Sequence, residues 1–192
     1  SNVTQHEGSI DALASNPTIT LGSNATFPAG HIVTRGNIDG EGHRSGADVS
    51  TSNTTFTDIN IQTKITAKYP SSGGSKNSKI LIRFYTAGWG GTTTNQDLYV
   101  TFCRYSTQPS SSKTYASSDD IHQPGSDPLY NVQSSPGTSK QFTYSYQGFD
   151  EQAHSAQDYW YRAFFKVGGG NAIRIMNQYG PYWFWAEELL IN

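Results

Sequence analysis

The stretch TTFTDINIQTKITAKYP, from Thr54 to Pro70, shows the most regular alternation of apolar and polar side chains in the chain. One face holds Ile61, Thr63, Ile65, Ala67 and Tyr69, and the other holds Gln62, Lys64, Thr66 and Lys68. Because successive side chains of a strand point to opposite faces, this period of two predicts a strand with one buried face. The stretch therefore indicates a fold built from half-buried β-strands.

Short apolar or alternating segments recur along the chain, separated by runs of Gly, Ser, Asn and Pro. We predict strands in KILIRFYTAGW (79–89), DLYVTFCRY (97–105), QFTYSYQGF (141–149), DYWYRAFFKV (158–167) and YWFWAEELLI (182–191). The glycine-rich segment GGGNAIRIMNQYG (168–180) is expected to form a hairpin with residues 158–167. Since no apolar helical period runs far, the sequence predicts an all-β fold, a jelly-roll-like antiparallel β-sandwich.

The length of 192 residues suits one domain with a core and is short for two. Apolar residues are sparse among Ser, Asn, Thr and Gly in residues 1–27, which predicts an extended N-terminal arm. The sandwich domain is expected over residues 28–192. Within it, residues 106–140 are polar and rich in Ser, Pro, Gly and Asp, so this region is either a functional loop or disordered.

The charge balance and the hydropathy exclude two kinds of partner. The formal net charge is -2 and the pI about 6.2, so there is no basic excess to neutralise phosphates, and we predict no nucleic-acid binding. No apolar run approaches the roughly 20 residues of a membrane span, so none is expected. The single cysteine, Cys103, lies in an apolar stretch and is expected to be a small core residue.

Residue types used in catalysis and metal binding occur without the matching spacing. The five histidines show no HxH or HExxH pattern, and DGEGH (residues 39–43) lacks the spacing of a calcium loop. Glu187 and Glu188 are adjacent on a predicted strand, so they face opposite sides and cannot form a glycosidase pair. We therefore predict no metal site, no cofactor and no enzymatic activity.

Two predicted strands, 158–167 and 182–191, are apolar on nearly both faces. One face fills the sandwich, and a large exposed apolar patch on the other is rare in a monomer. A second copy of the chain would cover that face, so Trp160, Phe164, Trp183 and Trp185 are candidate interface residues of a homotrimer. The alternative is that a loop or the N-terminal arm of the same chain covers it.

Four aromatic or imidazole side chains are candidates for ligand binding. Trp89 stands among glycines, where it offers a flat ring to a sugar or another partner, or else caps the end of the sandwich. Tyr115, His122 and Tyr130 lie in the long polar region, whose composition resembles that of adaptable binding loops. The alternative for these three residues is a loop that only connects two strands.

Several motifs in residues 27–192 occur in an order and spacing that resemble a family of phage structural proteins, common among marine and cyanobacterial phages. These motifs are PAGHI (28–32), TTFTD (54–58), KITAKY (64–69) followed by SKIL (78–81), and the last strand AEELLI, with Glu188 at the position of the family's glutamate. The middle of the chain and the aromatic C-terminal region depart from the family pattern. Those regions would set the choice of ligand, so the target is not carried over from the family.

This resemblance implies a virion protein without enzymatic activity, most often a trimeric tip domain of a tail fibre. As a tail fibre, the chain would contact a host-surface glycan or protein through its distal loops. As a head fibre or capsid decoration protein, it would bind other virion proteins through the N-terminal arm. A free lectin-like carbohydrate-binding module is the third possibility, motivated by Trp89, Tyr115 and Tyr130.

Overall fold

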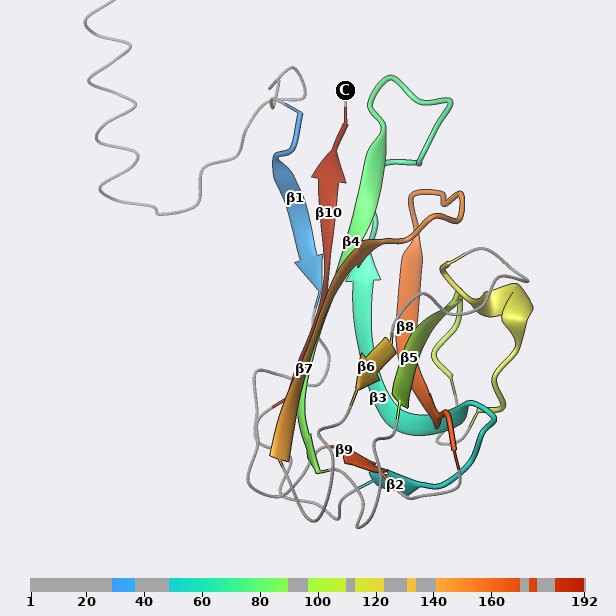
Figure 1. The fold of residues 1–192 in the computed structure, drawn as a ribbon. Coiled ribbons are helices and arrows are strands. Elements are labelled where there is room, and N and C mark those ends of the chain that lie inside the picture. The colour runs from blue at the N-terminus through green and yellow to red at the C-terminus, as the bar shows by residue number, and fades with distance from the viewer. Residues whose placement is uncertain are drawn as a thin grey trace, which may run out of the picture.

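The computed structural model describes residues 29–36, 49–89, 97–109, 113–122, 131–133, 141–169, 173–175 and 182–191. These residues form an antiparallel β-sandwich of two sheets, so the predicted all-β sandwich is confirmed (Figure 1). The jelly-roll connectivity stays a prediction. The predicted arm, residues 1–27, lies outside the described residues.

Ten strands and one short 3-10 helix make up the described part of the chain. They are β1 (Ile32–Gly36), β2 (Val49–Thr51), β3 (Thr57–Thr66), β4 (Ser78–Trp89), β5 (Asp97–Tyr105), η1 (Ser117–Asp119), β6 (Asn131–Gln133), β7 (Gln141–Phe149), β8 (Asp158–Val167), β9 (Ile173–Ile175) and β10 (Tyr182–Leu190). Sheet A has the order β1-β10-β4-β9-β2, with β7 also paired to β4, and sheet B has the order β3-β8-β5-β6.

In β3, the apolar and polar residues that alternate in the sequence correspond to side chains that alternate between buried and more accessible positions. Ile59, Ile61, Thr63 and Ile65 have almost no accessible surface, whereas Asn60 and Thr66 are exposed. Asn60 has a φ of 55°, and the register between β3 and β8 shifts between Asp58 and Gln62, which marks a local irregularity in the strand.

Aromatic rings from the two sheets meet in the core. The ring of Phe102 on β5 lies 5.5 Å from Phe84, 5.4 Å from Phe184 and 4.9 Å from Tyr146, measured between centroids. Phe84, Phe184 and Tyr146 belong to sheet A, so this cluster binds the two layers together. Cys103 is buried, as predicted, and burial raises the pKa of its thiol.

The predicted hairpin between residues 168–180 and β8 is wrong. β8 belongs to sheet B, whereas β9 pairs with β2 and with the end of β4 in sheet A. The chain thus crosses from one layer to the other after Val167, and β9 and β10 lie on the same sheet (Figure 1).

The outward face of β8 is covered by the same chain. Phe164 has no accessible surface, and its ring contacts Tyr115 at 5.8 Å between centroids. Residues 117–122 also complete the edge of β5, because Ile121 N–H donates to the Phe102 carbonyl at 3.0 Å. A segment of the same chain therefore covers Phe164, which leaves this residue no surface for a subunit interface and corrects its prediction, whereas Trp160 on the same face of β8 is only half-buried.

Candidate functional site

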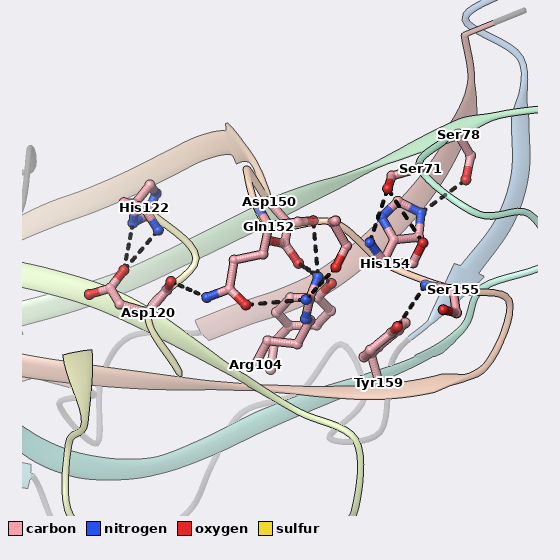
Figure 2. Close-up of polar contacts among 12 residues, drawn as sticks. Ser71, Ser78, Arg104, Asp120, His122, Asp150, Gln152, His154, Ser155 and Tyr159 are labelled. Atoms are coloured by element: carbon pink, nitrogen blue, oxygen red, sulfur yellow. Dashed lines mark hydrogen bonds and ion pairs between the residues drawn. The ribbon is translucent and has the colours of Figure 1, made fainter. Parts of the chain in front are cut away.

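Three neighbouring polar clusters involve the segment 113–122 and the loop from β7 to β8 (Figure 2). In the first, the Asp120 carboxylate accepts hydrogen bonds from the Thr101 hydroxyl at 2.7 Å, the Tyr115 hydroxyl at 2.8 Å and the His122 backbone N–H at 2.9 Å. His122 Nε2 lies 2.6 Å from the Tyr146 hydroxyl. Burial alone would raise the pKa of Asp120, but the His122 imidazole, whose Nδ1 lies 3.4 Å from Asp120 Oδ1, and the hydrogen bonds above outweigh burial and hold the pKa below its usual value.

The second cluster centres on Asp150, whose side chain has no accessible surface. Its carboxylate accepts hydrogen bonds from Arg104 Nη1 at 2.7 Å and from the Tyr161 hydroxyl at 2.8 Å. Burial raises the pKa of Asp150, and the neighbouring Arg104 offsets only part of that rise. Gln152 joins the first two clusters, because its amide donates to the Asp120 carbonyl while its carbonyl accepts from Arg104 Nη2.

The third cluster contains Ser78, His154 and Glu188. Ser78 Oγ lies 3.1 Å from His154 Nε2 and donates to Glu188 Oε1 at 2.8 Å. Glu188 also accepts the backbone N–H groups of Lys68 and Tyr69, at 2.8 Å each. Although the residue types resemble a catalytic triad, Ser78 has no accessible surface and its proton is directed to the carboxylate. These three clusters hold loops and sheets together inside the fold.

The structure places two of the predicted ligand-binding residues in the first cluster. His122 is buried, and the Tyr115 ring lies between Phe56 and Phe164, at 4.7 and 5.8 Å between centroids. His122 therefore offers almost no surface to a ligand, whereas Tyr115 is half-buried, and the assignment of these residues to ligand binding stays a prediction. Both side chains stabilise the segment that covers Phe164 on β8. Tyr130 lies outside the described residues, and of Trp89 only the backbone, paired with Gln141 and Arg174, is described.

The outer face of sheet A carries aromatic, cationic and amide side chains that are partly or fully accessible. We use this name for the outward side chains of β1, β10, β4 and β7. On β10 these are Trp183, Trp185, Glu187 and Leu189, because Tyr182, Phe184, Ala186 and Glu188 point into the core. Glu187 and Glu188 thus face opposite sides, as predicted.

The tryptophans of β10 are partly covered by neighbours on this face. The Trp183 ring lies 4.8 Å from that of Tyr85, and the Arg35 guanidinium lies 4.6 Å from the centroid of Trp185. Trp183 keeps 36% of its surface exposed, while Trp185 is half-buried. Trp160, on sheet B, is also half-buried, and Lys64 Nζ lies 4.8 Å from its ring centroid. The homotrimer through these tryptophans stays a prediction.

An ion cluster occupies the middle of the same face. Glu187 lies between Arg83, whose Nε donates to it at 2.9 Å, and Arg35, whose Nε is 3.6 Å away. Arg83 Nη1 also donates to Gln147 Oε1 at 2.7 Å. These contacts run across the four neighbouring strands β1, β10, β4 and β7 and fix the direction of the Arg83 side chain.

A hollow of about 240 Å³ opens beside this ion cluster. It is lined by Arg83, Phe84, Tyr85, Ser145, Tyr146, Gln147 and Trp185. The sequence did not identify this site, because its residues come from three strands and only the register brings them together. The available signal was Arg83 and Tyr85 at alternate positions of the strand predicted over residues 79–89.

Within the described ranges, no three or more His, Cys, Asp or Glu residues are grouped so as to hold a metal ion. Among the same residues, no helix has the length and apolar character needed to cross a membrane.

Comparison of the chain with protein-family models, with curated proteins and with solved structures finds no match in any of the three. The resemblance to phage structural proteins is therefore a prediction that these comparisons leave untested.

Proposed function

We propose that this chain is a non-enzymatic recognition domain that binds a partner on the outer face of sheet A. One observation carries the proposal: aromatic, cationic and amide side chains converge at an accessible hollow on an otherwise regular sheet. Binding sites are typically concave, with apolar walls and a few well-placed polar groups. The hollow has this composition, with Tyr85 and Trp185 beside Arg83, Gln147 and Ser145.

The buried polar groups support the same proposal, because they make the scaffold beneath this face rigid. His122, His154, Asp120 and Asp150 are engaged in hydrogen bonds that tie loops to strands. A rigid scaffold of this kind keeps the side chains of an exposed sheet at fixed positions, which favours recognition.

The biological setting rests on the resemblance of residues 27–192 to phage structural proteins. We propose that the chain is displayed on a virion, as the distal attachment domain of a fibre that carries several copies. Weak binding by each copy would then add through multivalency. A free lectin-like module is the second candidate, because the hollow would serve a cellular carbohydrate-binding protein equally well.

Competition with the intact particle tests the proposed function. Purified chain is expected to reduce adsorption of the phage to its host, and Tyr85→Ala is expected to abolish this effect. Lys166→Ala is the matched control, because Lys166 lies on sheet B and contacts the rings of Phe56 and Tyr99. Competition that survives Tyr85→Ala would show that another surface binds the host.

Gold-labelled antibody on particles then separates the settings. Label at the ends of tail fibres supports an attachment domain. Label on the capsid shell would contradict the attachment domain and support a capsid decoration protein. Particles without label would contradict both virion settings and support the free lectin-like module.

A further inference from the structure

We infer that the hollow on the outer face of sheet A binds an acidic saccharide, a sugar that carries a carboxylate or sulfate group. The inference rests on the proposed function, since it names the class of ligand for the same surface. It is carried by the shape of the hollow, by the pairing of rings with hydrogen-bonding groups, and by the local charge.

The register of the strands defines the shape of the hollow. Arg83 pairs with Gln147, Phe84 with Tyr146, and Tyr85 with Ser145 across β4 and β7. Because Phe84 and Tyr146 point into the core, only their backbone contributes to the floor of the hollow. The outward pair of Arg83 and Gln147 forms one end of the hollow, and the outward pair of Tyr85 and Ser145 forms the other. Alternate residues of a strand are about 7 Å apart, and Trp185, which pairs with Arg83, closes the side toward β10. The space is an open slot about as wide as one ring.

The chemistry of the walls suits a saccharide. Sugar rings present C–H groups on their faces and hydroxyl groups at their edges, so they need an aromatic side chain next to donors and acceptors. Tyr85 and Trp185 supply the rings, and Ser145 and Gln147 supply hydroxyl and amide groups on the exposed strand β7. The Trp185 Nε1–H is buried and has no hydrogen-bond acceptor among the described residues.

The charge of the face favours an anion. Its outward residues include three cations, Arg35, Lys79 and Arg83, and one acid, Glu187, a formal sum of 3 − 1 = +2 on a chain whose net charge is -2. Arg83 uses Nε and Nη1 for Glu187 and Gln147, and its Nη2 has no hydrogen-bond partner among the described residues. An arginine with its side chain held in place is well suited to bind a carboxylate or sulfate.

The exposed aromatic rings of this face offer too little apolar surface to form the core of an interface with a second copy of the chain. Trp183 exposes 36% and Phe149 37% of its surface, while Leu81, which pairs with Phe149, exposes 4%. An aromatic residue exposed by about a third offers only roughly 50–80 Å². A stable protein interface buries about 800 Å² per partner, so these rings supply a small part of one.

A glycan array with matched pairs tests the inference. Each acidic glycan is printed beside its neutral counterpart: sialylated beside desialylated, uronic acid beside its methyl ester, sulfated beside unsulfated. The chain is expected to bind members of the acidic set, with the neutral counterparts at least about tenfold weaker, because a hydrogen bond to a charged group is lost.

Three variants locate the binding site by titration calorimetry with the strongest acidic glycan. Arg83→Gln is expected to weaken binding about 10- to 100-fold, and Ser145→Tyr, which fills the hollow from an exposed position, to abolish it. Lys166→Gln removes an equal charge from sheet B and is expected to leave affinity within about twofold. The urea midpoint of each variant shows that it is folded.

The outcomes separate this inference from the proposed function. Equal binding of acidic and neutral glycans, abolished by Ser145→Tyr, would overturn the acidic ligand and keep recognition by this face. No binding on the array by a chain that still competes with the particle would overturn the saccharide and keep the function. Acidic-glycan binding that Ser145→Tyr leaves unchanged would overturn the site. Loss of both activities would overturn both proposals.

Discussion

The Ser78 hydroxyl donates a 2.8 Å hydrogen bond to the Glu188 carboxylate, and neither residue has accessible surface. The same carboxylate accepts the backbone N–H groups of Lys68 and Tyr69, which follow β3 in sheet B. Glu188 itself lies on β10 in sheet A. One buried carboxylate therefore joins the two layers of the sandwich at this end.

We expect Glu188→Ala to lower the free energy of unfolding by about 3–5 kcal/mol, because it leaves the buried Ser78 hydroxyl and two part-buried backbone N–H groups without their charged acceptor. Glu187→Ala is the matched control on the adjacent residue. Its partners Arg35 and Arg83 are 49% and 38% exposed, so the cost is expected to be about 1 kcal/mol or less. Urea unfolding of both variants measures the difference, and equal losses would contradict this role for Glu188.

A buried ion pair between Asp58 and Arg162 connects β3 to β8. The Arg162 Nε donates to Asp58 Oδ1 at 2.8 Å, and Asp58 also accepts the backbone N–H of Lys113 at 2.8 Å. We expect Asp58→Ala to cost about 3–5 kcal/mol, because the guanidinium then lies buried without its carboxylate.

The double variant Asp58→Ala with Arg162→Met provides the control for this pair. Removing both charges is expected to restore part of the stability lost in the single variant, since an apolar side chain needs no partner. If urea unfolding gives strictly additive losses, the ion pair is not the source of the effect.

Local features of the fold could be predicted from the sequence, whereas the pairing of distant strands could not. The alternation in residues 57–66 was enough to predict which side chains of β3 are buried, because burial within a strand depends on local period. The sheet that β9 joins was not predictable, because it is decided by pairing with Val49–Thr51 and with Gly88, which are distant in the sequence.

The candidate site shows the same limit. Composition drew attention to Tyr115 and His122, but their hydrogen bonds to Asp120 and Tyr146 depend on how the segment folds over β5. Trp183 and Trp185 were recognised as outward aromatic residues. Arg83 and Gln147 complete that surface only because β4 lies between β10 and β7, a fact of strand order that no local pattern contains.

Stability is expected to fall as the pH is lowered from 7.5 to 5.5, because of His154. Burial lowers the pKa of its imidazole from the ordinary 6.5, with Asp150 opposing, Arg104 assisting and Glu188 opposing that effect. The Nδ1 atom is buried and has no hydrogen-bond partner among the described residues, so a proton there would also be unsatisfied. The unfolded chain takes up a proton below pH 6.5 that the folded chain does not, and stability is lost as the pH falls.

Urea unfolding at several pH values measures this slope, whose limit for one proton is about 1.4 kcal/mol per pH unit. His154→Gln is expected to flatten it between pH 7.5 and 5.5. Asp150 affects the stability in the opposite direction above pH 3.8: its pKa is raised, so the folded chain keeps a proton that the unfolded chain has lost, and stability rises as the pH falls. Comparing the variant with the original chain therefore isolates the histidine, and an unchanged slope would exclude it as the source.

The predicted homotrimer and the ligand assignment can be tested together by solution mass. Light scattering at low concentration is expected to give about three times the chain mass of 21.0 kDa. Trp183→Ser is expected to leave that mass unchanged, because a ligand site on the outer face of sheet A requires the copies to associate through another surface than the one predicted from the sequence at Trp183 and Trp185. Ser145→Tyr provides a second substitution on the same face and is also expected to leave the mass unchanged.

A single-chain mass for the unsubstituted protein would contradict the predicted homotrimer. A trimer that becomes a monomer on Trp183→Ser would instead place the subunit contact on this face and overturn the ligand assignment.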